Sequence, residues 1–220
     1  MIVHDIAQRS AEWQALRLGR VCGSHAAQML ATVQKGEAAG RRNLRAQLVL
    51  ERLTGKPQER NFQSQAMTDG IEREDGALAK YEELSGRLTR IVGFVSHPTL
   101  MVGFSPDAAV GEFEGLVEAK CPIPATHLDY IESGKVPGDY MKQITHGLWV
   151  TGAAWCDFIS FQPDFPEEMR LRLVRVHRAD VDLKDYEAKL RTFLAEVDQK
   201  IATLKTLTNL TGTLAAAVGA

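Results

Sequence analysis

Two carboxylates and an amine within residues 100–120 are of the types needed for one metal-dependent catalytic site. Asp107 follows an apolar segment, and Glu118 and Lys120 lie two residues apart on the next one. Because side chains alternate along a strand, Glu118 and Lys120 share one face, and a hairpin would bring Asp107 beside them. Hard divalent cations prefer oxygen ligands, and a neighbouring lysine can orient a water molecule. The stretch therefore predicts a magnesium-type site.

The hairpin itself is predicted from strands at residues 101–104 and 116–120, joined by a glycine-containing reversal at 110–115. Val117 and Ala119 would then point into the core, while Leu116 would share the side of Glu118. The competing interpretation is a solvated polar face on an ordinary strand. Charges on an apolar strand are costly unless something pairs them, which favours the site.

The flanking sequence predicts an α/β fold, with a mixed sheet and helices on its faces. Amphipathic spacing predicts a helix after Ser10 and another beginning at Ser24. Residues 121–140 read as irregular. Further helices are expected at 43–53, 68–84, 139–151 and 183–204, and antiparallel strands at 155–163 and 168–178.

Glu74 falls within the apolar stripe of the predicted 68–84 helix, at helical spacing from Leu78 and Tyr81. A carboxylate on that face needs a partner. Either it joins the acidic hairpin through a shared metal or water, or it pairs with an arginine.

Length and composition limit the number of domains, the kind of surface and the location that the chain can have. With 220 residues, of which 45% are hydrophobic, the chain is expected to form a single domain over 1–220 with a flexible tail at about 206–220. A net charge of -2 excludes a globally basic surface, so nucleic acid would need a local channel. Cys22, Cys121 and Cys156 match no disulfide, zinc or iron–sulfur spacing. No signal-peptide core or membrane-length run is evident, so a soluble cytoplasmic protein is expected.

Four motifs follow one another along about residues 8–165. They are WQALRLG at 13–19 with Gly23-Ser24, Gly70-x-x-x-Glu74, Ser105-Pro106-Asp107 with LVEAKCP at 116–122, and Tyr140-Met141-x-Gln143 with Trp149 and Trp155. In this order they give the chain a resemblance to the phage lambda exonuclease (YqaJ-like viral recombinase) family of the PD-(D/E)xK nuclease superfamily. The resemblance implies a restriction-endonuclease-like core, a mixed central β-sheet flanked by α-helices, and a bacterial host or a prophage as the source.

The resemblance implies digestion of the 5′-ended strand of duplex DNA to mononucleotides, processively, leaving a 3′ single strand for recombination. Asp107, Glu118 and the Ala119 carbonyl would hold Mg²⁺, with Mn²⁺ as an alternative. Lys120 would orient or help deprotonate the attacking water. Glu74 and Gln143 would form the outer edge of the site.

Arg17 and Ser24 match family positions that grip the 5′-terminal phosphate, and Ser105 would bond the same group. A guanidinium and a serine at a helix start suit an anion. Trp13 would stack on a terminal base. The simpler interpretations are a surface salt bridge for Arg17, an N-cap for Ser24 and a core position for Trp13.

One departure concerns the position six residues after Lys120, where the family prototype has arginine and this chain has Thr126. The neighbouring His127, and also His146, are expected to be structural histidines. Another cation would have to substitute for the missing arginine, or the grip on phosphate would be weaker.

The resemblance also implies a homotrimeric ring that threads DNA, with Arg41, Arg42 and Arg45 contacting the DNA backbone in its channel. A single-strand annealing protein is an expected partner, and no membrane is. Two alternatives stay open: an endonuclease of the same superfamily acting on unbroken or structured DNA, and a non-catalytic DNA-binding module.

Overall fold

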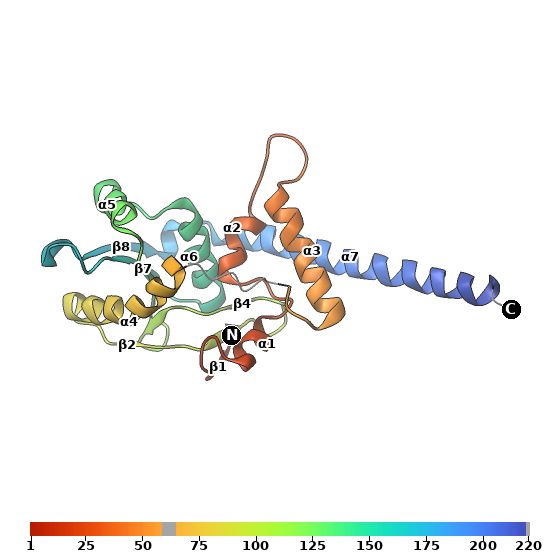
Figure 1. Cartoon of the computed structure of the whole chain (residues 1–220), viewed down its shortest axis with the longest axis horizontal. Coiled ribbons are helices and arrows are strands. Elements are labelled where there is room, and N and C mark those ends of the chain that lie inside the picture. Colours follow the sequence, from red (N-terminus) through yellow and green to blue (C-terminus); the bar gives the residue numbers. More distant parts are fainter. Residues whose placement is uncertain (59–64, 219–220) are drawn as a thin grey trace.

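The computed structural model describes the backbone of residues 1–58 and 65–218, and the side chains of residues 1–58 and 73–208 (Figure 1). The elements are β1 (Ile2–His4), α1 (Ala11–Arg17), a 3₁₀ turn (Gly23–His25), α2 (Ala26–Met29), α3 (Ala39–Thr54), α4 (Gln65–Ser85), β2 (Thr89–Arg90), β3 (Phe94–Ser96), β4 (Gly103–Phe104), β5 (Ala108–Val110), β6 (Gly115–Lys120), α5 (Pro124–Ser133), α6 (Gly138–Thr151), β7 (Trp155–Phe161), 3₁₀ turns at Glu167–Met169 and Arg178–Asp180, β8 (Leu171–His177) and α7 (Leu183–Val218).

A five-stranded mixed sheet forms the centre, in the order β2-β5-β6-β7-β8. The β6–β7 pair is parallel and the other pairs are antiparallel. Both faces of β6 are buried. Leu116 packs into a core shared with α6 and α7, and Val117 packs into a second core shared with α4. Helices therefore cover both faces, as predicted for an α/β fold.

The predicted hairpin is present, but its first strand is wrong. The strand that pairs with β6 is β5, with Ala108 opposite Val117, and β4 belongs to a separate three-stranded sheet with β1 and β3. Pro106 lies between β4 and β5, and proline cannot donate to a strand ladder, so the strand breaks there. Leu116 also lies in the larger core, not beside solvent.

Other differences lie at element boundaries. Residues 121–140, expected to be irregular, contain α5, which has Pro124 in its first turn and ends at Gly134 with a φ of 62°. Ser24 is not an N-cap, because it lies inside the 3₁₀ turn capped by Cys22. The antiparallel β7–β8 pair is confirmed.

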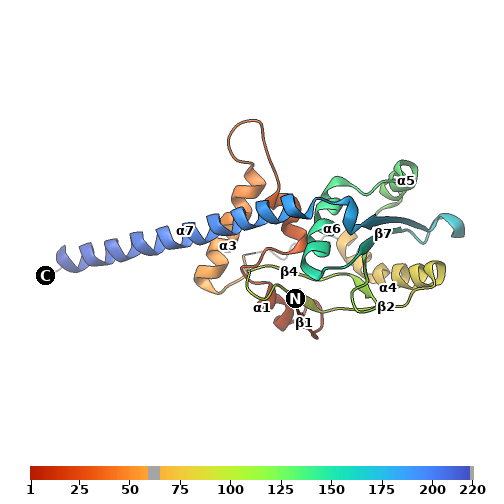
Figure 2. The same ribbon diagram turned by 180° about the vertical axis from the view of Figure 1, so that it is seen from behind.

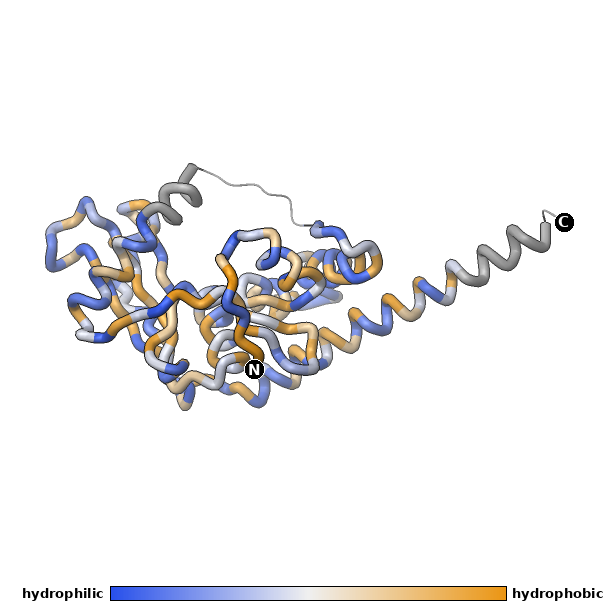
Figure 3. Tube along the Cα trace, turned by 90° about the horizontal axis from the view of Figure 1, so that it is seen from below, coloured by the Kyte–Doolittle hydropathy of each residue, from blue (hydrophilic) through white to orange (hydrophobic). Residues whose placement is uncertain are grey.

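Helix α7 packs along α3 and α6 and then continues past the body of the molecule, which is clearest from behind (Figure 2). It begins at Leu183, as predicted, but runs to Val218, beyond the expected end at 204. Hydrophilic and hydrophobic residues alternate along its described part (Figure 3). Residues 219–220 of the expected flexible tail lie outside the described residues. Among the helices that the structure describes, none is long and apolar enough to cross a bilayer.

Candidate active site

Asp107, Glu118 and Lys120 converge at the open end of the β5–β6 pair, and together they form the carboxylate site. The Asp107 Oδ2 accepts a hydrogen bond from the Ala119 backbone N–H at 2.7 Å. The Lys120 Nζ lies 3.7 Å from the same oxygen and donates to the Ala119 carbonyl at 3.0 Å and to Glu118 Oε1. The predicted convergence of these three side chains is therefore observed.

Helix α6 closes the carboxylate site from one face of the sheet. The Gln143 Nε2 donates to Glu118 Oε1 at 2.6 Å, and the Lys120 ammonium lies 5.2 Å from the centre of the Tyr140 ring. The helix can approach this closely because Gly147 faces Phe104, where a Cβ would lie 2.6 Å from the ring. Gln143 thus lies where the sequence predicted.

The Glu118 carboxylate is buried and incompletely paired. Its side chain is 1% exposed, and Oε2 has no hydrogen-bond partner among the side chains described, those of residues 1–58 and 73–208, or their backbone. Burial raises the pKa of Glu118 to about 7, against the opposing influence of Lys120 and with reinforcement from Asp107. Burial by itself would lower the pKa of Lys120, but the two carboxylates outweigh it and hold that pKa above its ordinary value. The site therefore carries an acidic oxygen that lacks a positive partner.

This oxygen provides a test of whether the residues fit a divalent cation. The predicted ligands are two carboxylates and the Ala119 carbonyl, a hard oxygen set of the kind Mg²⁺ accepts alongside water. No group of three or more His, Cys, Asp or Glu side chains suited to a metal occurs in the described part of the chain. The unpaired Glu118 Oε2 fits a cation, whereas Glu118 Oε1 and the Ala119 carbonyl already accept from Lys120. A cation at those two oxygens would share them with the lysine.

Glu74 on α4 combines the two interpretations drawn from its sequence. It forms an ion pair with Arg9, with 3.2 Å between the guanidinium Nη2 and Oε2. Burial, followed by the charge of Asp107, raises the pKa of Glu74, while Arg9 and Lys120 lower it. Glu74 is therefore paired with an arginine and also lies within electrostatic range of the carboxylate site.

A second group of contacts joins Trp13, Arg17, Ser24 and Ser105, the residues predicted to bind the 5′-terminal phosphate or the base beside it. We call this group the phosphate cluster after that prediction. The Trp13 indole donates to Ser105 Oγ at 2.7 Å, and the Arg17 guanidinium lies 4.2 Å from the Trp13 ring centre. The Arg17 Nη2 is 3.5 Å from Ser24 Oγ. Residues from two distant parts of the chain, 13–24 and 105, thus meet, and neither a surface salt bridge of Arg17 nor a core role for Trp13 describes them.

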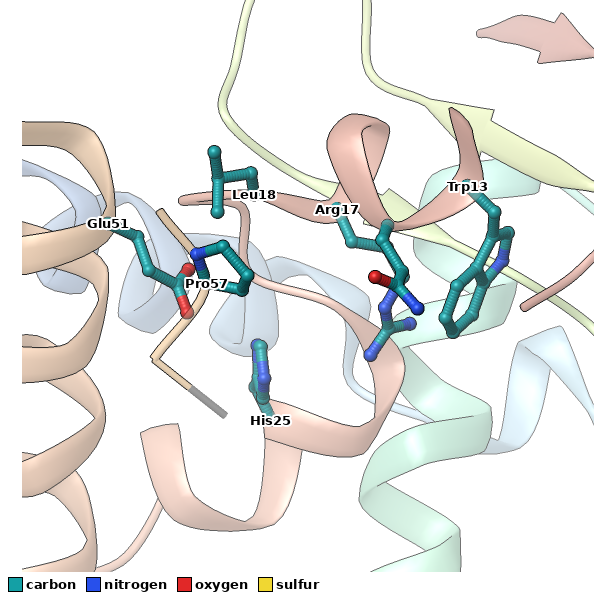
Figure 4. Close-up of a pocket in the computed structure, with 7 residues that line it drawn as sticks. Trp13, Arg17, Leu18, His25, Glu51 and Pro57 are labelled. Carbon is teal, nitrogen blue, oxygen red and sulfur yellow. The ribbon is translucent and has the colours of Figure 1, made fainter. Parts of the chain in front are cut away.

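A cavity of about 120 Å³ adjoins the phosphate cluster. Figure 4 shows Trp13 and Arg17 on one side of it, with Glu51 of α3 and Pro57 on the other. Its full lining is Trp13, Gln14, Arg17, Leu18, His25, Glu51 and Pro57. Sequence analysis did not find His25, Glu51 or Pro57, because only the packing of α3 against the first helices brings them to this place.

The remaining predicted residues have structural contacts. His127 is buried and bonded to Ser160 and the Met169 carbonyl, and His146 is bonded to Tyr186 and the Gly103 carbonyl, as expected. Burial lowers the pKa of His146 to about 4, so it is neutral. Thr126 lies half-buried on α5.

Two of the three arginines predicted to contact the DNA backbone, Arg41 and Arg45, form ion pairs within the chain. Both form ion pairs with Glu196, at 2.8 and 2.9 Å, and both also pair with Glu37. Their charge is therefore matched locally, which the sequence could not show because Glu196 is remote in the chain.

A scan against protein families matches the YqaJ-like viral recombinase domain over residues 12–154. The chain belongs to this family. A search of curated protein sequences finds no match. Among solved structures, the alkaline exonuclease LHK-Exo from Laribacter hongkongensis is 36% identical, with a TM-score of 0.82, and the alignment covers 92% of this chain and all of that one. The complex of LHK-Exo with dAMP superposes with a TM-score of 0.83 at the same identity and coverage.

A phage-related exonuclease from Haemophilus somnus 129PT shares the fold at 13% identity, with a TM-score of 0.65 over 84% of this chain and 96% of that one. The recombinase-family resemblance and the restriction-endonuclease-like α/β fold predicted from the sequence are thereby confirmed.

Proposed function

We propose that the protein is a Mg²⁺-dependent exonuclease that digests the 5′-ended strand of duplex DNA to mononucleotides and leaves a 3′ single strand for recombination. Membership of the recombinase family and the 36% identity to an alkaline exonuclease support a DNA exonuclease in general. The observation that carries the finer proposal is the position of the phosphate cluster next to the carboxylate site, through Ser105 and Asp107.

The chemistry can be assigned to named groups. Asp107, Glu118 and the Ala119 carbonyl would hold the ion, which when bound polarises the scissile phosphate and a water molecule. Lys120 holds the attacking water and offsets the negative charge that develops on the phosphate in the transition state. Gln143 orients Glu118 through its 2.6 Å hydrogen bond. Mn²⁺ is an alternative ion of similar ligand preference.

The phosphate cluster supplies the preference for DNA ends. A guanidinium binds a phosphate through parallel hydrogen bonds, and the hydroxyl group of Ser24 can donate to the same anion. The Ser105 hydroxyl donates to the Gly93 carbonyl at 2.8 Å, so its proton would have to turn from that carbonyl to reach the phosphate. Trp13 presents an aromatic surface for a terminal base. Two residues span at most about 7 Å, so a phosphate held at Ser105 lies close to Asp107, at a separation suited to release of one nucleotide. LHK-Exo was crystallised with dAMP, a mononucleotide.

The homotrimeric ring is part of this proposal. Enclosure of DNA within the ring would account for processivity, even though the net charge of the chain is only -2. The single-strand annealing partner is a proposal of the same kind, since the exposed 3′ strand is its natural substrate. The competing function is an endonuclease of the same superfamily. An end-phosphate cluster argues against it, because internal cutting requires no such group.

Digestion of a closed circular duplex and a linear duplex, each with Mg²⁺, separates the two functions. The linear DNA is supplied with 5′-phosphate or with 5′-hydroxyl ends. We expect release of mononucleotides from the phosphorylated linear DNA and an intact circle. Appreciable cutting of the circle would reject the exonuclease, and an undiminished rate in Lys120→Ala would show that the chemistry assigned to this site is wrong. Failure of the parent to digest either DNA would support a non-catalytic DNA-binding module.

Arg17→Ala tests the phosphate cluster in the same assay. We expect the preference for 5′-phosphate over 5′-hydroxyl ends to fall about tenfold, because a charge-assisted pair to phosphate is lost. Arg20→Ala is the matched control, a nearby half-buried arginine that donates to the Leu100 carbonyl. An unchanged preference in Arg17→Ala would refute the assigned role.

A further inference from the structure

Arg9 lies between the phosphate cluster and the carboxylate site, because residues before and after it are hydrogen-bonded to the loop that precedes Asp107. Before it, Gln8 Nε2 donates to the carbonyl oxygens of Val92 and Pro106, at 2.8 and 2.9 Å. After it, Trp13 donates to Ser105. Since Ser105 and Pro106 directly precede Asp107, the backbone that carries Arg9 is held against the active-site loop.

The Arg9 side chain points to the acidic side of this junction. Its guanidinium Nη2 lies 3.2 Å from Glu74 Oε2, and Glu74 is influenced by the charges of Asp107 and Lys120. The Arg9 side chain is 49% exposed and that of Glu74 only 23%. The Glu74 carboxylate is therefore mostly buried, whereas part of the Arg9 guanidinium faces solvent.

This contact leaves most of the guanidinium available for another anion. Arginine has five N–H donors in a planar fork, and the Glu74 contact uses one of its terminal nitrogens. A half-exposed ion pair contributes little to the stability of the fold. A phosphate beside Glu74, in contrast, would meet a fixed and permanently charged donor.

We propose that Arg9 is a further DNA-binding residue, whose guanidinium, held in place by Glu74, binds a backbone phosphate of the strand that enters the carboxylate site. The phosphate is distinct from the terminal one assigned to Arg17. This inference rests on the proposed function, in which DNA is the substrate.

The test is DNA binding measured by fluorescence anisotropy over a range of salt concentrations, with 5′-phosphorylated duplex and Ca²⁺ in place of Mg²⁺. Arg9→Gly is the informative variant, because Arg9 has a φ of 67°, a left-handed conformation that glycine adopts without strain. We expect its dissociation constant to rise about tenfold and the slope of log K against log salt to fall by about 1, as for loss of one phosphate contact.

Two further variants serve as controls for this result. Arg9→Lys, which keeps the charge, should retain the salt slope of the parent. Arg191→Ala removes an arginine of similar exposure, 54%, that pairs with Glu187 on α7, and should change neither quantity. Arg9→Gly with the slope of the parent, whatever its affinity, would overturn the proposal and leave Arg9 as a partner of Glu74 alone.

The outcome is independent of whether DNA is cut. A reduced slope in Arg9→Gly together with a parent protein that fails to digest linear duplex would uphold the contact and reject the exonuclease. Digestion by the parent, together with an unchanged slope in Arg9→Gly, would uphold the exonuclease and reject the contact between Arg9 and DNA.

Discussion

Two buried carboxylates on neighbouring strands have opposite surroundings. Asp157 on β7 is fully buried, and it accepts two hydrogen bonds from Arg175 at 2.7 Å and a third from the Tyr81 hydroxyl at 2.8 Å. Glu118 on β6 is as deeply buried, but Lys120 and Gln143 both donate to Oε1, while Oε2 has no partner in the part of the chain that the structure describes. The two side chains face opposite sides of the sheet, toward α4 and α6 respectively.

The difference distinguishes a structural charge from one kept for chemistry. A buried ion pair is tolerated when each oxygen of its carboxylate accepts a hydrogen bond, and both oxygens of Asp157 do. The hydrogen bond to Asp157 raises the pKa of Arg175, so that pair is stable in its charged form. Glu118 instead retains an unpaired oxygen at a cost to stability, as expected of a position that a cation completes.

The largest expected effect is on activity, at Glu118. Glu118→Gln keeps the shape of the side chain but removes its charge, so exonuclease turnover should fall roughly 10³-fold. The free energy of unfolding should change by less than about 1 kcal/mol, because burial disfavours the Glu118 charge and raises its pKa, and because Lys120 stays 3.7 Å from the Asp107 carboxylate. Turnover assays and denaturant unfolding measure the two quantities. Glu114→Gln, in the exposed turn before β6, is the control. A large loss of stability in Glu118→Gln would contradict the difference between Asp157 as a structural charge and Glu118 as a catalytic one.

Asp157→Asn should show the reverse pattern. It leaves Arg175, 30% exposed, beside a neutral group, so the free energy of unfolding should fall by about 2–3 kcal/mol and the unfolding temperature by roughly 5–10 °C. Turnover of the folded fraction should stay within about twofold of the parent. Asp185→Asn breaks an exposed pair with Lys189 and should cost less than about 1 kcal/mol. A loss of turnover as large as that of Glu118→Gln would show that Asp157 also serves the chemistry.

The smallest expected effect is stabilisation by Mg²⁺. A ligand that binds only the folded state, at about tenfold excess over its dissociation constant, adds about 1.4 kcal/mol, or roughly 3–5 °C in unfolding temperature. The parent and Asp157→Asn should both gain this amount on replacing EDTA with Mg²⁺, and Glu118→Gln should not. Equal gains in all three would place the ion elsewhere.

The sequence identified most of the carboxylate site because its determinants are local. Strand alternation put Glu118 and Lys120 on one face, and Pro106-Asp107 stood where a reversal of the chain could return the aspartate to them. Helical spacing on α6 put Gln143 and Gly147 on one side. These periodicities follow from backbone geometry, so they survive even though the first strand of the hairpin was assigned to the wrong residues.

Only the tertiary structure decided the contacts between distant segments. No local pattern could show that Arg9 pairs with Glu74, that Glu196 neutralises Arg41 and Arg45, or that Glu118 lacks a partner for one oxygen. Whether a charge is satisfied depends on which elements pack beside it, and that packing is determined by burial summed over the whole chain. The chain by itself thus determined which residue types could carry chemistry, and the fold decided which of them were left available for it.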